Sequence, residues 1–539
     1  MQGVIARDGR VLAREATLTT VAAGSVAALL LWVGPPGVDL AAHAYQRTLL
    51  LHHGFVLWNN FWYAGRYSFV TYSFIYYPLA AWLGIKALAV ATIAASALAF
   101  TLLVWREWGP IGRLSSRAFA VLWAGIVFSA AFPFALGTAL ALLALAALQR
   151  GRRGVFTVLI LLTLLASPLA FLILAVVLAG LGLSTKLRHA RYAAAVVATG
   201  LLGEVALYRM FPDGGRFPFG SWQLIPAVIF CTLGIFVSRD VPSAKPLRGI
   251  FWAYLGICLI AYAIPSSLGS NVERLRYAAL PIALLLVSLR HWRPWWLTAV
   301  AVVLATAWNV WPVAMSFAQA TSDPARSPAY WTSTIAYLHS HLSPSFRVEA
   351  VDTVDHWPAE FLPSSGIPIV RGWYRQADFP ENELLYDAKL PPGTYRAWLR
   401  RLGVRYVVIS DAPPDYSSRI EAQMIRSGRS GLVPVFRARH VTVYQVPDAR
   451  SIVTGPGLAS VQWLWPSRAV LAISKPGRYR VALRWSPYWR SQQGCVSRGS
   501  DGMVRLSVRR PGLAQLTFSP SLSSGLETLA GVTDRRRCG

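Results

Sequence analysis

Side chains able to act as general acids or bases are scarce in the first 315 residues, which contain only eight carboxylates. Four of the eight, Asp39, Glu204, Asp213 and Glu273, fall in or next to gaps that the basic residues assign to the outer side of a membrane. If this part of the chain performs acid–base chemistry on that side, its carboxylate is one of these four. Asp39 is the best placed, because it opens the stretch DLAAHAYQRTLLLHHG directly after the helix-stopping sequence PPG.

The stretch that begins with Asp39 has the pattern of an amphipathic helix. Asp39 and His43 are four residues apart and share one face, which Gln46 and Arg47 continue one turn later. Leucines supply apolar contact. We expect a helix on the outer membrane surface that presents a carboxylate, an imidazole and a guanidinium together. The alternative is an ordinary interfacial helix that Asp39 merely caps.

Aromatic residues crowd the next stretch, WNNFWYAGRYSFVTYSFIYYP, which begins at Trp58. A belt of aromatic rings at a membrane interface explains much of this run. It does not explain why Arg66 lies among them. Rings such as Trp58, Trp62 and Tyr63 suit a stacked sugar, and a guanidinium suits a phosphate. The belt and the substrate groove remain alternatives.

Arg274 and Arg276 occupy a third candidate segment, PSSLGSNVERLRYAALP. The arginine fork matches phosphate geometry, so a lipid-linked phosphate is its natural ligand at the lipid–water boundary. The alternative is a snorkelling flank or a salt bridge with Glu273. Glu204 lies inside an apolar segment, where an acid is a functional candidate by default, although it could equally pair with Arg209 or with an arginine of another helix.

The elements that must position these residues are membrane helices. The chain is 55% hydrophobic and 14% charged, and the charge deficit is confined to about the first 315 residues. With the N-terminus inside, seventeen basic residues fall in cytoplasmic gaps and seven outside, as the positive-inside rule requires. We expect a multi-pass plasma-membrane protein with a cytoplasmic N-terminus and an extracytoplasmic C-terminal region. Its eleven predicted membrane segments are 17–34, 86–105, 117–133, 135–149, 154–166, 169–184, 192–210, 222–238, 249–264, 278–290 and 295–314.

The remainder of the chain has an ordinary globular composition. Helix and strand patterns alternate over 317–449 and predict an α/β domain after the membrane domain of 1–316. Strands punctuated by Gly and Pro over 450–539 predict a small β-sandwich. The tail contains neither a glycine-rich phosphate loop nor a metal-spaced His/Cys set. Cys495 and Cys538 are expected to form a disulfide if the tail is outside the cytoplasm.

The charge of the tail bears on its partners. It contains 28 Lys and Arg against 16 Asp and Glu, a net charge of about +12. An outside location argues against nucleic acid, so membrane lipids with anionic head groups or glycans bearing phosphate or carboxylate are the expected partners. The alternative is a solvated basic surface that keeps the domain soluble.

Several stretches resemble the GT-C superfamily of polytopic glycosyltransferases, which use polyprenyl-phosphate sugars on the outer face of the membrane. The resemblance covers most of the chain and is closest to the actinobacterial branch of membrane proteins related to 6-pyruvoyl-tetrahydropterin synthase. The stretches are VDLAAHAYQ, YAGRYSFVTYSFIYYPL, FPFALGTALALLALAALQRGRR, GWYRQADFPENELLYDAKLPPGTYRAWLRRLGVRYVVIS and RWSPYWRSQQGCV.

The resemblance implies a reaction and a role for each candidate residue. A sugar would pass, with inversion, from a polyprenyl-phosphate donor to a cell-envelope glycan or glycolipid. Asp39 matches the first outer-loop acid, which acts as general base on the acceptor hydroxyl. Arg274, Arg276 and Arg66 are the candidates for the donor phosphate. The candidates for substrate and acceptor contacts are His43, Arg47, Trp58, Trp62, Tyr63 and Glu204.

Some GT-C members hold a divalent cation near the acid, and the resemblance extends this expectation to Mg²⁺, Mn²⁺ or Ca²⁺ on Asp39 and His43. Many members carry paired acids in this loop, whereas Leu40 follows Asp39 here. Two other functions fit the sequence. One is a transporter or flippase of lipid-linked saccharides, and the other is a non-catalytic envelope scaffold whose tail binds glycans.

Overall fold

The computed structural model describes residues 2–184 and 190–531. Each predicted membrane segment coincides with helical structure, although the segment expected at 117–133 is divided among α5, the 3₁₀ turn η3 (Trp123–Gly125) and α6. The helices are α1 (Gln2–Val33), α4 (Ile85–Trp108), α5 (Arg113–Leu122), α6 (Ile126–Ser129), α7 (Phe132–Gln149), α8 (Arg153–Ala166), α9 (Pro168–Ser184), α10 (Ala190–Met210), α11 (Ser221–Val237), α12 (Lys245–Ala263), α13 (Ala279–Leu289) and α14 (Trp295–Ser322).

Six helical stretches within the described residues are long and apolar enough to cross a membrane. Three further apolar helices, α8, α9 and α11, are shorter. This is the helix content of a multi-pass membrane protein. The expected count of eleven crossings and their orientation stay predictions. The six stretches are Gly9–Val33, Ile85–Ser129, Phe132–Gln149, Ala190–Met210, Pro242–Ala263 and Trp295–Ser322.

The chain divides into two compact units. The first, here called the membrane unit, comprises Met1–Val38, Tyr72–Glu204 and Gly215–Ala320. The second, the globular unit, comprises Asp39–Thr71, Val205–Gly214 and Thr321–Gly539. The change at residue 320 lies near the predicted boundary at 316. The segments 39–71 and 205–214, which were expected to belong with the membrane helices, are instead part of the globular unit.

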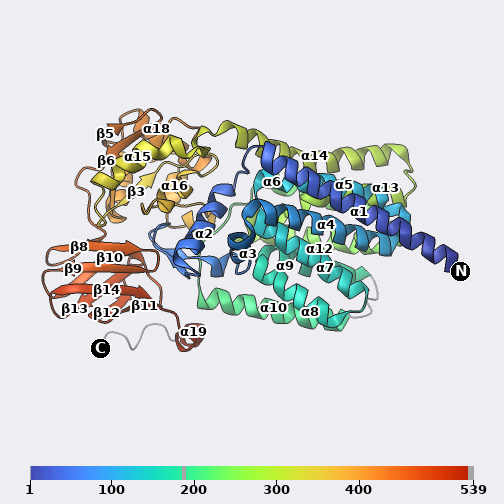
Figure 1. Cartoon of the computed structure of the whole chain (residues 1–539), viewed down its shortest axis with the longest axis horizontal. Coiled ribbons are helices and arrows are strands. Elements are labelled where there is room, and N and C mark those ends of the chain that lie inside the picture. The colour runs from blue at the N-terminus through green and yellow to red at the C-terminus, as the bar shows by residue number, and fades with distance from the viewer. Residues whose placement is uncertain (1, 185–189, 532–539) are drawn as a thin grey trace. The chain divides into compact units, whose positions relative to one another are not determined.

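Within the membrane unit, α1 packs against α4, α4 against α7, α7 against α8, and α9 against α12 (Figure 1). Small residues allow the closest of these approaches. A Cβ atom added to Gly249 of α12 would lie 2.1 Å from the carbonyl oxygen of Gly180 in α9. Small residues at helix contacts are typical of membrane proteins, because close backbone packing replaces the hydrophobic driving force that lipid removes.

The first part of the tail is the predicted mixture of helices and strands. Its sheet has the order β3-β4-β6-β5, with β3 and β4 parallel and the other pairs antiparallel. Gly403, at φ +77°, makes the turn from α17 into β4. The elements are α15 (Pro328–His341), β3 (Arg347–Ala350), α16 (Pro358–Ser364), α17 (Pro392–Arg401), β4 (Val404–Ser410), α18 (Arg419–Arg426), β5 (Val433–Arg437) and β6 (Val441–Gln445).

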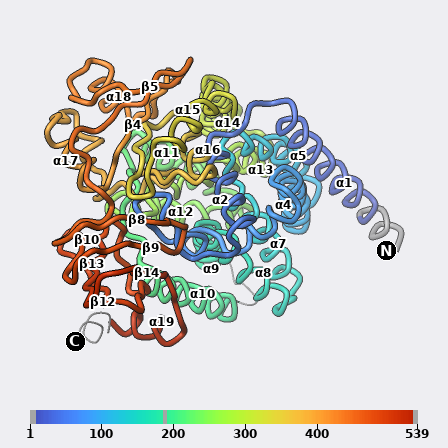
Figure 2. Tube along the Cα trace, turned by 60° about the vertical axis from the view of Figure 1, so that its left-hand side comes forward, coloured from blue at the N-terminus to red at the C-terminus, as the bar shows by residue number. Residues whose placement is uncertain are grey.

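The second part of the tail contains two four-stranded antiparallel sheets, ordered β12-β13-β10-β7 and β11-β14-β9-β8. Several of their strands, among them β8, β9, β10 and β13, lie together in the red part of the trace (Figure 2). They account for the strands predicted after residue 450. Cys495 is disulfide-bonded, whereas Cys231 and Cys258 are free. Cys538, the predicted partner, lies outside the described residues, so the pairing stays a prediction. The strands are β7 (Val453–Thr454), β8 (Ala459–Trp465), β9 (Arg468–Ile473), β10 (Gly477–Arg484), β11 (Trp489–Ser491), β12 (Gly494–Arg498), β13 (Met503–Val508) and β14 (Gly512–Phe518).

The segment 39–71 forms the helix predicted from its pattern, but in different surroundings. α2 (Leu40–His53) packs against α16 of the globular unit rather than presenting a free polar face. A short hairpin of β1 (Trp58–Asn59) and β2 (Arg66–Tyr67) follows. The backbone N–H of Asn60 donates to the carbonyl of Pro466, 2.8 Å away. Contacts to residues some 400 positions later therefore determine where this segment belongs.

Candidate functional site

Asp39 is held by a residue from the tail. It immediately precedes α2, but its side chain makes no capping hydrogen bond, so the simple cap interpretation is not supported. The indole N–H of Trp373 donates to Oδ1 of Asp39 at 2.7 Å. A charge-assisted hydrogen bond of this length orients a carboxylate. Asp39 is half-buried and so remains partly accessible.

His43 and Gln46, expected on an open polar face, are buried. His43 is fully buried, and its ring centroid lies 5.8 Å from that of Trp373. The side-chain amide of Gln46 donates to the hydroxyl of Tyr374 at 2.9 Å. Arg47 is half-buried on the same helix. The polar face of α2 is thus an internal contact of the globular unit, and the prediction that it meets substrate directly is wrong for His43.

The aromatic residues predicted to stack on a sugar are core residues. Trp58 is 2% exposed and packs against Trp489 and Phe518. Trp62 is completely buried and donates its indole N–H to the carbonyl of Ala359 at 3.0 Å. Tyr63 is also buried, and its hydroxyl donates to the carbonyl of Tyr374 at 2.8 Å. None of the three rings has a free face, so their assignment to a substrate groove is corrected.

Arg66, predicted to bind a phosphate, serves the fold instead. Its guanidinium is ion-paired with Asp213 and lies over the ring of Tyr374, 3.4 Å from the centroid. Its Nε donates to the carbonyl of Tyr67 at 2.9 Å. The side chain is only 6% exposed. Because the Arg66 guanidinium is buried and already neutralised by Asp213, it is not available to bind a phosphate, and the predicted phosphate role of Arg66 is corrected.

Arg274 has a different environment, within the membrane unit. It lines a cavity of about 620 Å³ whose walls come mainly from α4, α7, α9, α12 and α13. Its side chain donates to the amide oxygen of Asn271 at 3.2 Å and lies over the ring of Phe134, 5.2 Å from the centroid. Both partners are neutral. Among the described residues, no carboxylate forms an ion pair with Arg274.

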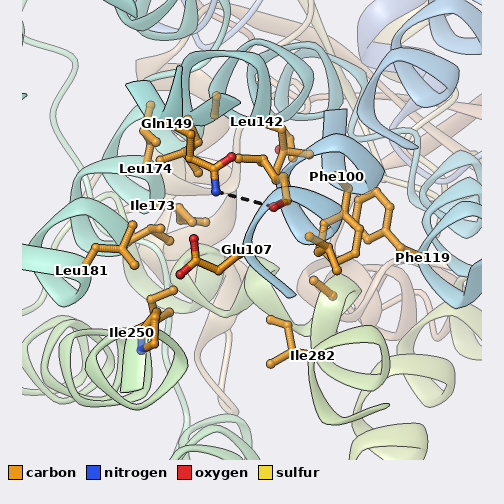
Figure 3. Close-up of a pocket in the computed structure, with 18 of the residues that line it drawn as sticks. Phe100, Glu107, Phe119, Leu142, Gln149, Ile173, Leu174, Leu181, Ile250 and Ile282 are labelled. Carbon is orange, nitrogen blue, oxygen red and sulfur yellow. Dashed lines mark hydrogen bonds between the residues drawn. The ribbon is translucent and has the colours of Figure 1, made fainter. Parts of the chain in front are cut away.

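The cavity wall is predominantly apolar (Figure 3). Phe100, Phe119, Leu142, Ile173 and Leu174 project into the space, with Glu107 at another part of the wall. Its lining follows α7 from Phe134 to Gln149, about 22 Å at the rise of an α-helix. Arg106 and Arg150, at the ends of α4 and α7, also belong to the lining. The cavity therefore combines a long apolar interior with the side chains of three arginines, Arg106, Arg150 and Arg274, and one carboxylate, Glu107.

Arg276 and Glu204 do not share the situation of Arg274. Arg276 forms an ion pair with Glu273 at 3.3 Å, which realises the salt-bridge alternative. Glu204 is half-buried in α10 and makes no hydrogen bond or ion pair with any described residue. Of the three arginines predicted to bind phosphate, the fold thus leaves Arg274 with an uncompensated charge.

The residues around Asp39 do not fit the expected divalent cation. His43, the second predicted ligand, is fully buried against Trp373, and the residue after Asp39 is Leu40, which has no metal-binding group. Within residues 2–184 and 190–531, no three His, Cys, Asp or Glu side chains are grouped as a metal site requires. No step of the proposed reaction is therefore assigned to a metal.

Trp373 is the site residue that residue patterns missed. It lies in GWYRQADFPENELLYDAKL, a stretch that carries part of the family resemblance but had no assigned role. Its neighbour Tyr374 contacts Gln46, Tyr63 and Arg66. The available signal was this aromatic pair between two arginines. Its partner at Asp39 is 334 positions away and could not be read from spacing.

The same stretch anchors a buried network of charges. Arg371 forms ion pairs with Glu349 and Glu421, each at 3.0 Å. Arg375 pairs with Asp415 at 2.9 Å and keeps the pKa of that carboxyl below its ordinary value, although burial opposes the shift.

His356 is a third buried cation of this network, hydrogen-bonded to Asp352. Burial alone would lower the pKa of His356, but the Asp352 carboxylate outweighs it and raises that pKa to about 9. These fixed charges hold the loop that carries Trp373.

Comparison with known proteins gives likenesses of low identity. No protein-family model and no curated protein matches the chain. The solved structure of the arabinofuranosyltransferase AftD from Mycobacteria is similar over 95% of this chain and 40% of its own, with a TM-score of 0.45 and 14% identity. This chain therefore spans less than half the length of AftD.

Two structures of the oligosaccharyltransferase AglB from Archaeoglobus fulgidus are also similar. One contains an inhibitory peptide and a dolichol-phosphate, covers 73% of this chain and 69% of its own, and has a TM-score of 0.43. The other contains zinc and sulfate, covers 73% and 68%, and has a TM-score of 0.42. Both are 12% identical to this chain. Likenesses at this level assign neither an activity nor a site to the chain.

Proposed function

We propose that this protein is a membrane glycosyltransferase that takes a sugar from a polyprenyl-phosphate carrier on the outer face of the plasma membrane. The acceptor would be a cell-envelope glycan or glycolipid. The observation that carries the proposal is Arg274, a guanidinium without an ion-pair partner among the described residues, at the wall of a long apolar cavity. An isoprenoid phosphate has the complementary chemistry, an apolar chain attached to an anion.

The cavity suits part of such a carrier. Its volume of about 620 Å³ is in the range of small-molecule sites. Rings and aliphatic side chains would contact the isoprenoid chain, and Arg274 would donate hydrogen bonds to phosphate oxygens. Removing a phosphate from water is costly unless a cation receives it. An unpaired arginine lowers that cost, whereas Arg276 already neutralises Glu273.

Asp39 is the proposed general base. It would take the proton of the acceptor hydroxyl while that oxygen attacks the anomeric carbon and the bond to the phosphate oxygen breaks. The phosphate leaves already ionised, so no second carboxylate is required to protonate it. Trp373 is the proposed positioning residue, because its N–H fixes one carboxylate oxygen. Asp39 and Arg274 belong to different compact units, so each role is tested by its own variant.

The test compares Asp39→Asn with Trp373→Phe in the full-length protein, using radiolabelled polyprenyl-phosphate sugars and an envelope acceptor fraction. Asparagine keeps the shape and an oxygen for Trp373 but cannot accept the proton, so transfer should fall about 10²- to 10⁴-fold. Trp373→Phe loses one hydrogen bond and should reduce kcat about tenfold with little change in donor KM.

Exposed Glu527→Gln, at the far end of the tail, is the control and should transfer normally. Full activity of a folded Asp39→Asn protein would refute the role of Asp39 as base.

A second candidate function is the movement of lipid-linked saccharides across the membrane. The observation in its favour is that the cavity lining follows α7 from Phe134 to Gln149, with Arg274 near one end and Arg150 at the other. Proteoliposomes containing a fluorescent polyprenyl-phosphate sugar distinguish the two functions. If a membrane-impermeant reductant added outside also bleaches the lipid that began in the inner leaflet, without covalent transfer of the sugar, the result would favour movement. Labelled product without accelerated lipid exchange would favour the transferase.

A further inference from the structure

The outer face of the sheet β11-β14-β9-β8 carries an aromatic pair that no function described above uses. Trp463 of β8 is 52% exposed, although large aromatic side chains elsewhere in the tail are mostly core residues. Its ring lies 6.3 Å from that of Trp465, with only 20° between the planes. Arg468 of β9 pairs with Trp465 in the strand register, and its guanidinium lies over the Trp465 ring, 4.0 Å from the centroid.

A β-bulge is the reason that Trp463 faces solvent. Residues two apart on a strand normally point to the same side, and Val461 is buried at 3% exposure. The register of β8 on β9 shifts between Val461 and Trp463, which inserts Gln462 and reverses the phase. Trp463 and Trp465 then share the outer face. Bulges are used in this way to redirect a side chain.

Polar side chains continue this face across the sheet. Gln515 of β14 lies opposite Val470, which in turn lies opposite Trp463. Thr517 lies opposite Arg468, and the side-chain amide of Gln515 donates to the Thr517 hydroxyl at 3.0 Å. Two aromatic rings at the sheet edge are thus followed by an arginine, an amide and a hydroxyl.

The face is also held in place. The hairpin between β8 and β9 is fixed at its tip, where the side-chain amide of Asn60 donates to the carbonyl of Trp465 at 2.8 Å. Arg468 has no carboxylate partner among the described residues, in contrast to Arg375, which also lies over an aromatic ring but is paired with Asp415. The fixed rings of Trp463 and Trp465, beside the Arg468 guanidinium, suit a ligand with apolar faces and negative charge.

We propose that Trp463, Trp465, Arg468 and Gln515 form a binding site for a glycan chain that carries carboxylate or phosphate groups. The C–H face of a sugar unit would cover the exposed ring of Trp463, and the Trp465 ring would hold the Arg468 guanidinium beside it. Arg468 would donate to the anionic substituent, and Gln515 would exchange hydrogen bonds with hydroxyl groups. A lipid surface fits less well, because the polar side chains of β9 and β14 lie within the same face rather than around it.

The experiment measures binding of the full-length protein in detergent to an array of bacterial envelope polysaccharides, with uronic-acid or phosphate groups and without them. The wild type should be retained by anionic glycans. Trp463→Ala should weaken that binding about tenfold, because the apolar contact of roughly one ring face with the sugar is lost. Arg468→Gln should reduce the preference for anionic over neutral glycans.

Tyr416→Ala is the matched control, since Tyr416 is an exposed ring, 47% accessible, beneath a paired arginine, and it should bind normally. Failure of the wild type to bind any glycan, or equal binding by Trp463→Ala, would overturn the proposal.

A dye attached at Trp463→Cys in nanodiscs gives a further readout. Quenching of the dye by spin-labelled lipid with no response to glycan would likewise overturn the proposal in favour of membrane contact. The inference does not depend on catalysis: Asp39→Asn should bind glycan normally, and Trp463→Ala should still transfer sugar to a short acceptor.

Discussion

Three buried arginines of the globular unit and Arg274 of the membrane unit have different partners. In the globular unit, Arg66, Arg371 and Arg375 each form an ion pair with a carboxylate, at positions where the arginine is largely buried. In the membrane unit, Arg274 contacts an amide and a ring instead. Because a buried charge must be compensated, the paired arginines are committed to the fold. An arginine compensated only by neutral groups is the one that can receive an anionic ligand.

The same distinction separates two groups of aromatic residues. Trp58 and Trp62 stand in the most aromatic stretch of the sequence and are buried. Trp463 stands in an unremarkable strand and is exposed by a bulge. Residue type alone therefore identified candidates for phosphate and sugar binding, and the partners of each residue decide which candidates remain.

The strongest test of this distinction removes a committed arginine. Arg371→Met should leave Glu349 and Glu421 buried without their cation and destabilise the protein by about 3–5 kcal/mol. Thermal unfolding in detergent measures the loss, and failure to obtain folded protein is the extreme result. Arg401→Met, at an exposed position at the end of α17, is the control and should change little. An unchanged midpoint for Arg371→Met would contradict a structural role for this network.

The second test compares the replacement of two neighbouring arginines of the membrane unit, Arg274 and Arg276, by glutamine. Arg274→Gln should raise the donor KM about 10- to 100-fold without altering stability, because a charge-assisted hydrogen bond to phosphate is lost. Arg276→Gln should instead lower the unfolding midpoint, since Glu273 would be left buried and unpaired, while donor KM stays the same. Equal kinetic effects from the two variants would show that ion pairing does not separate them.

The smallest expected effect is a pH dependence of stability in the globular unit. The folded-state pKa of His356 is about 9, above its ordinary value of 6.5, so its protonation stabilises the folded state. That contribution is complete below pH 6.5 and is lost as pH rises through 9.

The free energy of unfolding of the wild type should therefore fall by about 1–3 kcal/mol between pH 6.5 and 9 through this group, and His356→Asn should abolish that fall. Asparagine is chosen because residue 356 has φ +61°, which asparagine tolerates. Parallel stability–pH curves for the variant and the wild type would contradict the assignment.

Local pattern was sufficient for the elements of this protein. Apolar runs predicted the helices of the membrane unit, alternation predicted β3, and a continuous apolar run predicted β4, because burial of side chains at a fixed period is a property of neighbouring residues. The helix beginning after Asp39 was also predicted, since its period is local. Asp39 was selected as the candidate base because acidic residues are scarce in the first 315 positions, which is likewise visible in the sequence.

Tertiary structure alone decided which residues are available. Trp373 reaches Asp39 across 334 positions, and Arg66 meets Asp213 across 147. Neither pairing leaves a trace in spacing, and each changes the role of the residue it joins. A bulge at Gln462 reverses the face of one strand without any distinctive residue. Sequence fixes what a side chain can do chemically, but its exposure and its charge balance depend on partners that only the folded chain brings together.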